Sequence, residues 1–193
     1  MKPLALLIAA VPLGLLAQPA AAQGVSTSAY RTTLDYASCA VGKDAAAAKA
    51  LLATVPGSAE ARAAAAKVTA LGCDGKPNDE GLRGAVAEKL YLATYATPPA
   101  EATGEPAAFT GSGVRDLAYY DIARCVATRD PLGADMLIRS DLRSEAEKAA
   151  LKRIMPVLGG CVPSGFQLGL DREKLRGMVA EGLYNIRGAA GTN

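Results

Sequence analysis

The chain contains no histidine and no tryptophan. Without histidine, catalysis by a Ser-His or Cys-His pair is excluded, as are histidine-ligated zinc sites and the side chain that titrates nearest neutral pH. Without tryptophan, the commonest platform for stacking a sugar ring is missing, so tyrosine or phenylalanine would have to replace it. An enzyme built from this chain would therefore have to rely on aspartate and glutamate for proton transfer.

The chain also lacks a strong charge of either sign. Its 21 Lys and Arg residues and 19 Asp and Glu residues give a formal net charge of +2. A chain so close to neutral gives no electrostatic reason to expect binding to nucleic acid or to an anionic membrane. Beyond the first residues, charges such as Lys49 and Arg139 interrupt every apolar run, so no membrane span is predicted.

The first residues have the three parts of a secretory signal. Lys2 supplies a positive charge, residues 4–17 are apolar, and small residues precede a cleavage site after Ala22. The apolar run is too short, and too interrupted at Pro12, to be a transmembrane helix. The sequence therefore predicts a signal peptide over residues 1–22 and a periplasmic or secreted mature protein.

Two stretches of the chain match two later stretches, which indicates an internal duplication. Residues 34–72 align without a gap on residues 120–158, and both stretches end shortly before a cysteine. The strongest match joins residues 82–91 to residues 175–184, where eight of the ten positions are identical. Because unrelated segments rarely agree this well, the sequence predicts two copies of one unit.

Helical signals dominate both copies, and no alternation of period two indicates a strand. Each copy is predicted to form four helices, so the predicted fold is all-α, a tandem duplication of a four-helix unit. The first unit is expected over residues 23–96 and the second over residues 114–193. Proline and glycine are frequent in residues 97–113, which are therefore predicted to form a linker.

Capping residues predict where several helices begin. Asp44 in the first copy, and Asp130 followed by Pro131 in the second, are typical of a helix N-terminus. Ser58 and Ser144 are the expected caps of the third helix in each copy, and Glu147 completes a capping box after Ser144.

Other signals predict where the helices of each copy end. The first helices are expected at about residues 28–41 and 113–127. The third helix of each copy is expected to end near its cysteine, Cys73 or Cys161. Pro156 falls inside the third helix of the second copy and is predicted to end or kink that helix early.

Four cysteines in an exported chain indicate disulfide bonds. The sequence alone allows three pairings, but equivalent copies should bond equivalently. We therefore predict the disulfides Cys39–Cys73 and Cys125–Cys161. The chain has no Cys-x-x-Cys pair, and its cysteines are too far apart for the usual zinc spacing, so redox and metal roles are disfavoured.

Arginine and glutamate recur in both copies, as Arg83 with Glu88 and Arg176 with Glu181. Five residues apart on a helix, the members of a pair point about 140° apart and do not face each other. We interpret them as interhelical or cap-directed salt bridges repeated with the fold. The alternative is a pseudo-symmetric polar site between the copies. Separately, Glu88 and Glu181 would form the carboxylate pair of an enzyme if they faced each other across a pseudo-twofold axis.

Glycine and tyrosine also recur in the matched block. Gly84 and Gly177 are expected inside helices, where glycine costs about 1 kcal/mol relative to alanine. A cost of that size favours a close contact between two helices at these positions. Tyr91 and Tyr184 end the block, and we interpret them, like the other tyrosines, as core residues.

Three features resemble a group of uncharacterised, alanine-rich exported helical-repeat proteins of alphaproteobacteria. They are the cysteine-bearing first helix, the start of the third helix at Pro56-Gly57-Ser58, and the block at residues 82–91. The resemblance covers most of the mature chain. It implies no activity, cofactor or site.

No pattern in the chain marks a catalytic, metal or cofactor site. The sequence therefore predicts a non-enzymatic interaction or structural module of the cell envelope, with an envelope protein as the expected kind of partner. One alternative is a carrier that holds a small apolar or glycan ligand between the two units. A further alternative is a carboxylate-based enzyme that acts on glycan. An apolar cavity between the units would favour the carrier.

Overall fold

The computed structural model describes residues 26–104 and 109–190, and the predicted signal peptide lies outside these residues. Within these ranges the chain forms α-helices, one short 3-10 helix (η1) and no strand, which confirms the all-α class. The elements are α1 (Thr27–Lys43), α2 (Ala45–Leu52), α3 (Ala59–Thr69), α4 (Asp79–Thr94), η1 (Arg115–Leu117), α5 (Ala118–Arg129), α6 (Pro131–Arg139), α7 (Glu145–Cys161) and α8 (Arg172–Ala190).

Most of the helices begin at a polar side chain that accepts a hydrogen bond from a backbone N–H three residues later. Such caps satisfy one of the N–H groups that a helix start leaves without a partner inside the helix. The predicted starts of α2, α3, α6 and α7 are confirmed in this way. The capping residues are Ser26, Asp44, Ser58, Asn78, Asp130, Ser144 and Asp171.

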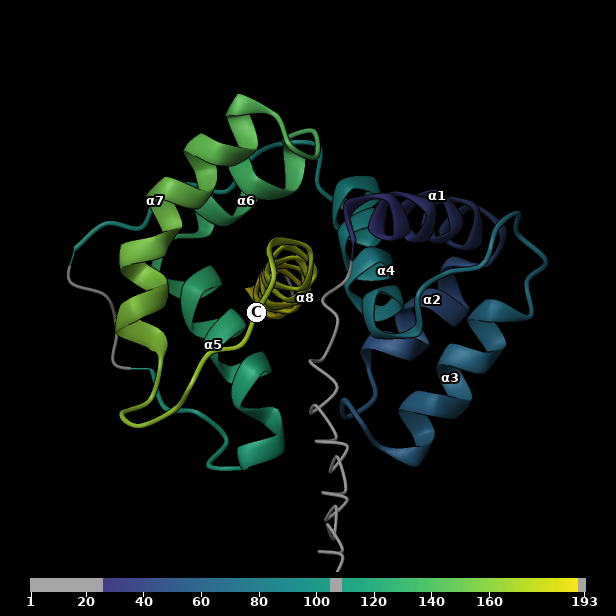
Figure 1. The fold of residues 1–193 in the computed structure, drawn as a ribbon, viewed down its shortest axis with the longest axis horizontal. Helices are drawn as coiled ribbons and strands as arrows, with labels where there is room; N and C mark the ends of the chain where they lie inside the picture. The colour runs from purple at the N-terminus through teal and green to yellow at the C-terminus, as the bar shows by residue number, and fades with distance from the viewer. Residues whose placement is uncertain (1–25, 105–108, 191–193) are drawn as a thin grey trace, which may run out of the picture.

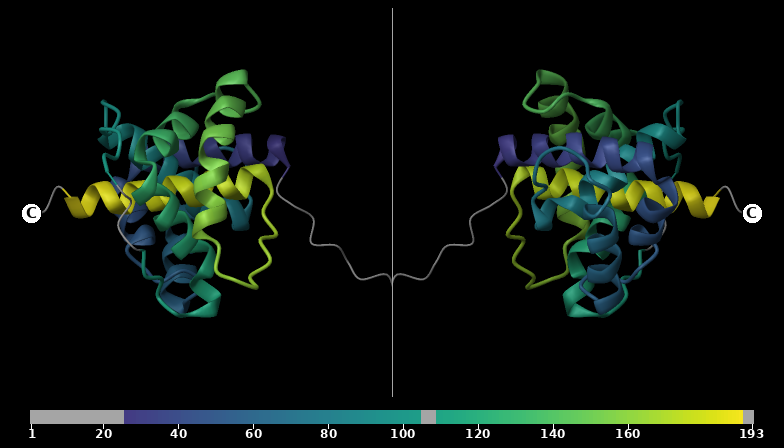
Figure 2. Two further views of the ribbon diagram at one scale, coloured as in Figure 1. Left: turned by 90° about the vertical axis from the view of Figure 1, so that its left-hand side faces the viewer. Right: turned by 90° about the vertical axis from the view of Figure 1, so that its right-hand side faces the viewer.

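Helix α8 lies at the centre of the molecule, with α1 to α4 on one side and α5 to α7 on the other (Figure 1). It packs against α4, α5 and α6, while α1 packs on α4. Side views show the last turns of α8 extending beyond the other helices (Figure 2). One continuous cluster of buried side chains includes Leu34 and Tyr91 from the first half and Ile122 and Leu183 from the second. The two halves therefore share a core, whereas the predicted unit boundaries stay a prediction.

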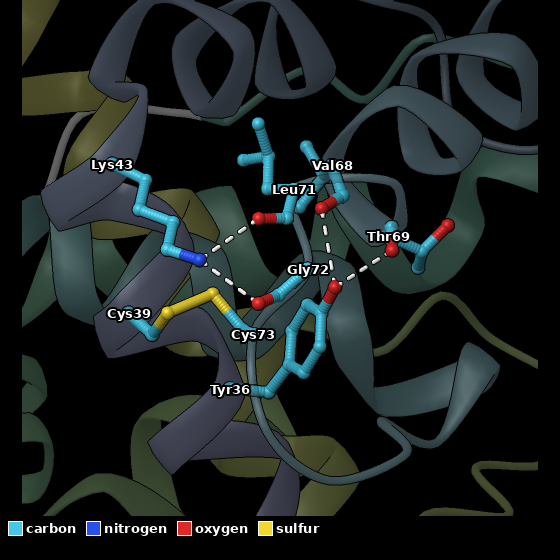
Figure 3. Close-up of a disulfide and its surroundings, with 8 residues drawn as sticks. All are labelled: Tyr36, Cys39, Lys43, Val68, Thr69, Leu71, Gly72 and Cys73. Carbon is cyan, nitrogen blue, oxygen red and sulfur yellow. Dashed lines mark hydrogen bonds between the residues drawn. A yellow bond between two sulfur atoms is a disulfide. The ribbon is translucent and has the colours of Figure 1, made fainter.

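Both predicted disulfides, Cys39–Cys73 and Cys125–Cys161, are present. Figure 3 shows how further hydrogen bonds fasten the end of α3, and the chain after it, to α1. The ammonium group of Lys43 donates to the carbonyl oxygens of Leu71 and Gly72, at 3.0 and 2.8 Å. The hydroxyl of Tyr36 donates to the carbonyl of Thr69 at 2.8 Å. Disulfides of this kind indicate an oxidising environment outside the cytoplasm.

The prediction that Pro156 ends or kinks its helix early was wrong about the end, because α7 continues to Cys161. A proline inside a helix leaves the carbonyl four residues earlier without its N–H donor. Here that residue is Lys152, and both Lys152 and Pro156 are exposed, so water can replace the missing donor. The cost of the proline is therefore small enough for the helix to continue.

The expected bounds of two other helices were also wrong. Helix α5 begins at Ala118 instead of about residue 113, because Gly113 has a left-handed φ of 74° and residues 115–117 form the 3-10 turn. Helix α3 ends at Thr69, four residues before Cys73. The left-handed Gly72, with a φ of 67°, turns the chain so that Cys73 meets α1 from a loop.

None of the helices in residues 26–104 and 109–190 is long and apolar enough to cross a bilayer.

Candidate functional site at the crossing of α4 and α8

Helices α4 and α8 touch backbone to backbone where Gly84 meets Gly177. A Cβ atom built on Gly84 would lie 2.5 Å from the Cα of Gly177, well inside any real carbon–carbon contact. A Cβ on Gly177 would lie 3.1 Å from the Cα of Gly84. Only glycine at both positions allows this approach. The close helix contact expected from the two mid-helix glycines is therefore present.

Two ion pairs flank this crossing, and each joins α4 to α8. The guanidinium of Arg83 donates to the carboxylate of Glu181 at 2.7 to 2.9 Å. The guanidinium of Arg176 donates to both oxygens of Glu88 at 2.8 and 2.9 Å. Each arginine thus pairs with the glutamate of the other helix, and the four residues singled out in the sequence come together around one crossing.

Each of the two arginines also binds the carbonyls at the end of a neighbouring helix. Arg83 donates to the carbonyl oxygens of Leu52 and Thr54, at 3.1 and 2.9 Å. Arg176 donates to those of Ile138 and Ser140, at 2.8 and 2.9 Å. The last carbonyls of a helix lack partners inside the helix and carry its negative dipole end, so a cation is favourable there. The arginines therefore hold α2 and α6 against the crossing.

The Arg176 side of the crossing is fully buried. The side chains of Arg176, Glu88 and Glu147 are 3%, 2% and 0% exposed, so this cation stabilises two buried carboxylates. The hydroxyl of Tyr30 donates to Glu88 at 3.3 Å. Burial raises the pKa of Tyr30 well above its ordinary value, and the negative charge of Glu88 raises it further. Tyr30 therefore stays a neutral donor.

A cavity of about 360 Å³ opens on the other side of the crossing, between α4, α5 and α8. We call it the seam cavity; residues of both halves line it, among them Tyr30, Arg83, Tyr120, Lys174, Met178 and Glu181. A smaller cavity of about 230 Å³ shares Arg83, Tyr120, Met178 and Glu181 with it. Apolar concave sites of roughly 300–1,000 Å³ between structural units are typical of small-molecule binding.

The charged side chains that line the seam cavity are already paired. Glu80 and Lys174 form an ion pair at 2.6 Å, as do Glu173 and Arg143, while Arg83 pairs with Glu181 at 2.7 Å. Each charge that lines the cavity is therefore neutralised by a partner, which favours an uncharged ligand.

Aromatic rings form much of the remaining wall of the seam cavity. Arg83 lies over the ring of Tyr120, with 5.9 Å between the guanidinium carbon and the ring centroid. Burial raises the pKa of Tyr120, and the nearby charge of Glu181 adds to that increase. Tyr120 therefore stays neutral at physiological pH and keeps a hydroxyl that both donates and accepts hydrogen bonds.

The arrangement gives no support to the carboxylate pair of a glycan-acting enzyme. Both oxygens of Glu88, and both oxygens of Glu181, accept hydrogen bonds from an arginine. Each carboxylate is held by its own arginine, and Glu181 lines the seam cavity whereas Glu88 does not, so the two carboxylates do not converge on one substrate position. Among the residues that the structure describes, no three potential metal ligands of the His, Cys, Asp and Glu types gather at one point.

The chain matches no protein-family model, no curated protein and no solved structure. The resemblance to exported helical-repeat proteins therefore stays a prediction.

The sequence singled out Arg83, Gly84, Gly177 and Glu181, which line the cavity, but not the rest of its lining. The sequence patterns indicate only core roles for Tyr30 and Tyr120 and no role for Lys174 or Met178. The one signal that could have indicated the cavity is a difference between the copies: within the matched block, Met178 of the second copy aligns with Ala85 of the first. A cavity depends on which side chains are missing from a space, and helical periodicity carries no such information.

Proposed function

We propose that this protein is an exported binding protein that holds a small, uncharged organic molecule in the seam cavity. The observation that carries the proposal is the cavity itself, which lies between the two halves and is lined by both. Its aromatic rings supply apolar contact, and its paired charges supply hydrogen-bonding groups without a net charge that attracts an ion.

We also propose that the halves are duplicated four-helix units, α1 to α4 and α5 to α8. Corresponding helices begin at corresponding caps, Asp44 with Asp130 and Ser58 with Ser144. Each half has one disulfide that joins its first helix to the end of its third helix or to the loop just after it. The reciprocal ion pairs across the crossing agree with a pseudo-twofold relation between the halves. The seam cavity would then lie between two structural repeats.

Export is part of this proposal. The predicted signal peptide at residues 1–22 would deliver the chain to the periplasm or beyond, where the two disulfides can form. A binding protein in that space would meet molecules from outside the cell.

The binding site can be tested with uncharged probes and two matched variants. Indole, cyclohexanol and N-acetylglucosamine represent an aromatic, an aliphatic and a glycan ligand, and protein NMR shifts report where each one binds. Met178→Trp fills the cavity that Met178 lines, while Met136→Trp makes the same change on α6 at an exposed residue. We expect at least one probe to shift resonances of α4, α5 and α8 in the parent and in Met136→Trp, and none to do so in Met178→Trp.

Two outcomes would contradict the proposal. One is that none of the three probes shifts resonances around the cavity at millimolar concentration. The other is that Met178→Trp, folded by circular dichroism, binds as well as the parent, which would locate the binding elsewhere.

The envelope interaction module stays a prediction. The large hydrophobic side chains that the described ranges expose, Val55, Val114, Met136 and Met155, lie on four different segments. Singly exposed hydrophobic side chains are normal on protein surfaces and do not identify a partner.

A further inference from the structure

Tyr30 fills one side of the space around the crossing and borders the seam cavity, which stays open on the other side. On the filled side, the ring of Tyr30 lies 3.4 Å from where a Cβ of Gly81 would be. Its hydroxyl oxygen lies 3.2 Å from a Cβ position on Gly177, and the hydroxyl donates to Glu88. The phenol of α1 thus sits over a glycine of α8 and ends at a buried carboxylate.

The same surroundings recur on the open side without the ring. In the alignment of the two copies, Gly177 corresponds to Gly84 and Glu88 to Glu181, and both counterparts line the seam cavity. The third contact, Gly81, corresponds to Lys174, which also lines it. The counterparts of the groups that hold Tyr30 therefore line the seam cavity, next to Tyr30, Gly81 and Gly177 themselves.

The counterpart of Tyr30 itself is absent from this space. Extending the alignment of the first helices places Asp116 opposite Tyr30. Asp116 is exposed in η1, where the second half forms a 3-10 turn and α5 has not yet begun. At position 116 the second half therefore has neither an aromatic residue nor an α-helical turn to carry one.

We infer that the seam cavity binds a neutral phenol, whose ring takes the place of the missing tyrosine and whose hydroxyl donates to Glu181. This inference rests on the proposed binding function and names its ligand class. A carboxylate can accept about four hydrogen bonds, so Glu181 can accept one from the ligand beside those from Arg83. Glu88 already does this in the other half, because it accepts a hydrogen bond from the hydroxyl of Tyr30 beside those from Arg176.

The walls of the seam cavity suit a substituted phenol. Tyr119 and Tyr120 offer aromatic rings, and Leu170 and Met178 offer apolar contact that adapts to the shape of the ligand. The cavity of about 360 Å³ exceeds the space of one ring, so an apolar substituent opposite the hydroxyl also fits. Such a phenol is either a free small molecule or the tyrosine side chain of a polypeptide.

Matched ligands test the hydroxyl without changing the protein. We expect p-cresol to bind in the seam cavity at least about tenfold more tightly than toluene. The hydroxyl of p-cresol can donate a hydrogen bond to the buried carboxylate of Glu181, whereas toluene has no donor. The preference should persist in Met136→Trp and disappear in Met178→Trp. N-acetyltyrosinamide and N-acetylphenylalaninamide repeat the comparison for a peptide source. If p-cresol binds and N-acetyltyrosinamide does not, the ligand is a free phenol; if both bind, a tyrosine side chain is accepted.

The results separate this inference from the proposed function. Equal affinity for p-cresol and toluene, with both in the seam cavity, would overturn the phenol assignment and leave the binding function standing. Binding of indole or cyclohexanol there without binding of p-cresol would do the same. Failure of all these probes to reach the cavity would overturn both.

Discussion

At the scale of single residues, two glycines determine how closely α4 and α8 approach. The backbones meet at Gly84 and Gly177, and this approach brings Arg83 and Glu88 within reach of their partners on α8. Any side chain at the contact would separate the helices and lengthen both ion pairs.

Alanine at Gly84 should therefore destabilise the protein, although alanine is the better helix former. The clash with the backbone of Gly177 should cost about 2 kcal/mol or more in the free energy of unfolding. Gly42→Ala is the matched control, because Gly42 is exposed in α1 and has nothing within 4 Å of its Cβ position. It should stabilise the protein by up to about 1 kcal/mol. Urea unfolding followed by circular dichroism gives both values; a neutral Gly84→Ala would argue against the contact.

A buried tyrosine makes stability depend on pH in the alkaline range. Burial, together with the hydrogen bond from its hydroxyl to Asp135, raises the pKa of Tyr91 from 10.0 to about 12. The unfolded chain loses this proton from pH 10 upward while the folded protein keeps it. The stability that protonated Tyr91 contributes to the folded protein is thus fully present below pH 10 and is lost as pH rises toward 12.

Tyr91→Phe should remove this contribution. We expect the variant to lose stability less steeply than the parent between pH 10 and pH 12, the interval between the two pKa values. Urea midpoints at several pH values in that range measure the slope. Identical slopes in parent and variant would refute the assignment of the shift to Tyr91.

At the scale of elements, one disulfide holds the loop after α3 to α1, and the other holds the end of α7 to α5. Each half has few large apolar residues and many alanines, which form helices well but bury little surface. A cross-link that restricts the unfolded chain compensates for a small core.

Removal of either disulfide should cost nearly the same stability. The bonds close loops with sequence separations of 34 and 36 residues. Chain entropy therefore predicts a loss of about 3–4 kcal/mol for Cys39→Ala with Cys73→Ala, and for Cys125→Ala with Cys161→Ala. Thermal unfolding of the two double variants, compared with the parent, provides the measurement. An unchanged melting temperature in one variant would show that its bond closes no costly loop.

At the scale of the whole molecule, the two halves depend on each other. The arginine of each half neutralises a glutamate of the other, and one continuous core contains residues of both. Residues 97–104 and 109–113, in the predicted linker, contain no helix, so contact between α4 and α8 joins the halves more firmly than the connection does. The seam cavity exists only because the halves pack in this arrangement.

The sequence by itself determined the helical class, several helix starts and the pairing of the cysteines. These features depend on local chemistry or on symmetry within the chain: Asp44 and Ser144 cap the residues that directly follow them. The four cysteines pair as equivalent copies should.

Only the tertiary structure decided which residues meet across the crossing. The spacing of Arg83 and Glu88 excluded a bond within one helix but could not name Glu181 and Arg176 as partners, because that choice depends on the crossing of two distant helices. The tolerance of Pro156 likewise depended on which face of α7 meets water. The sequence does not predict the seam cavity for the same reason. The cavity lies where residues from α1, α4, α5 and α8 leave space, and no local sequence pattern indicates an empty volume.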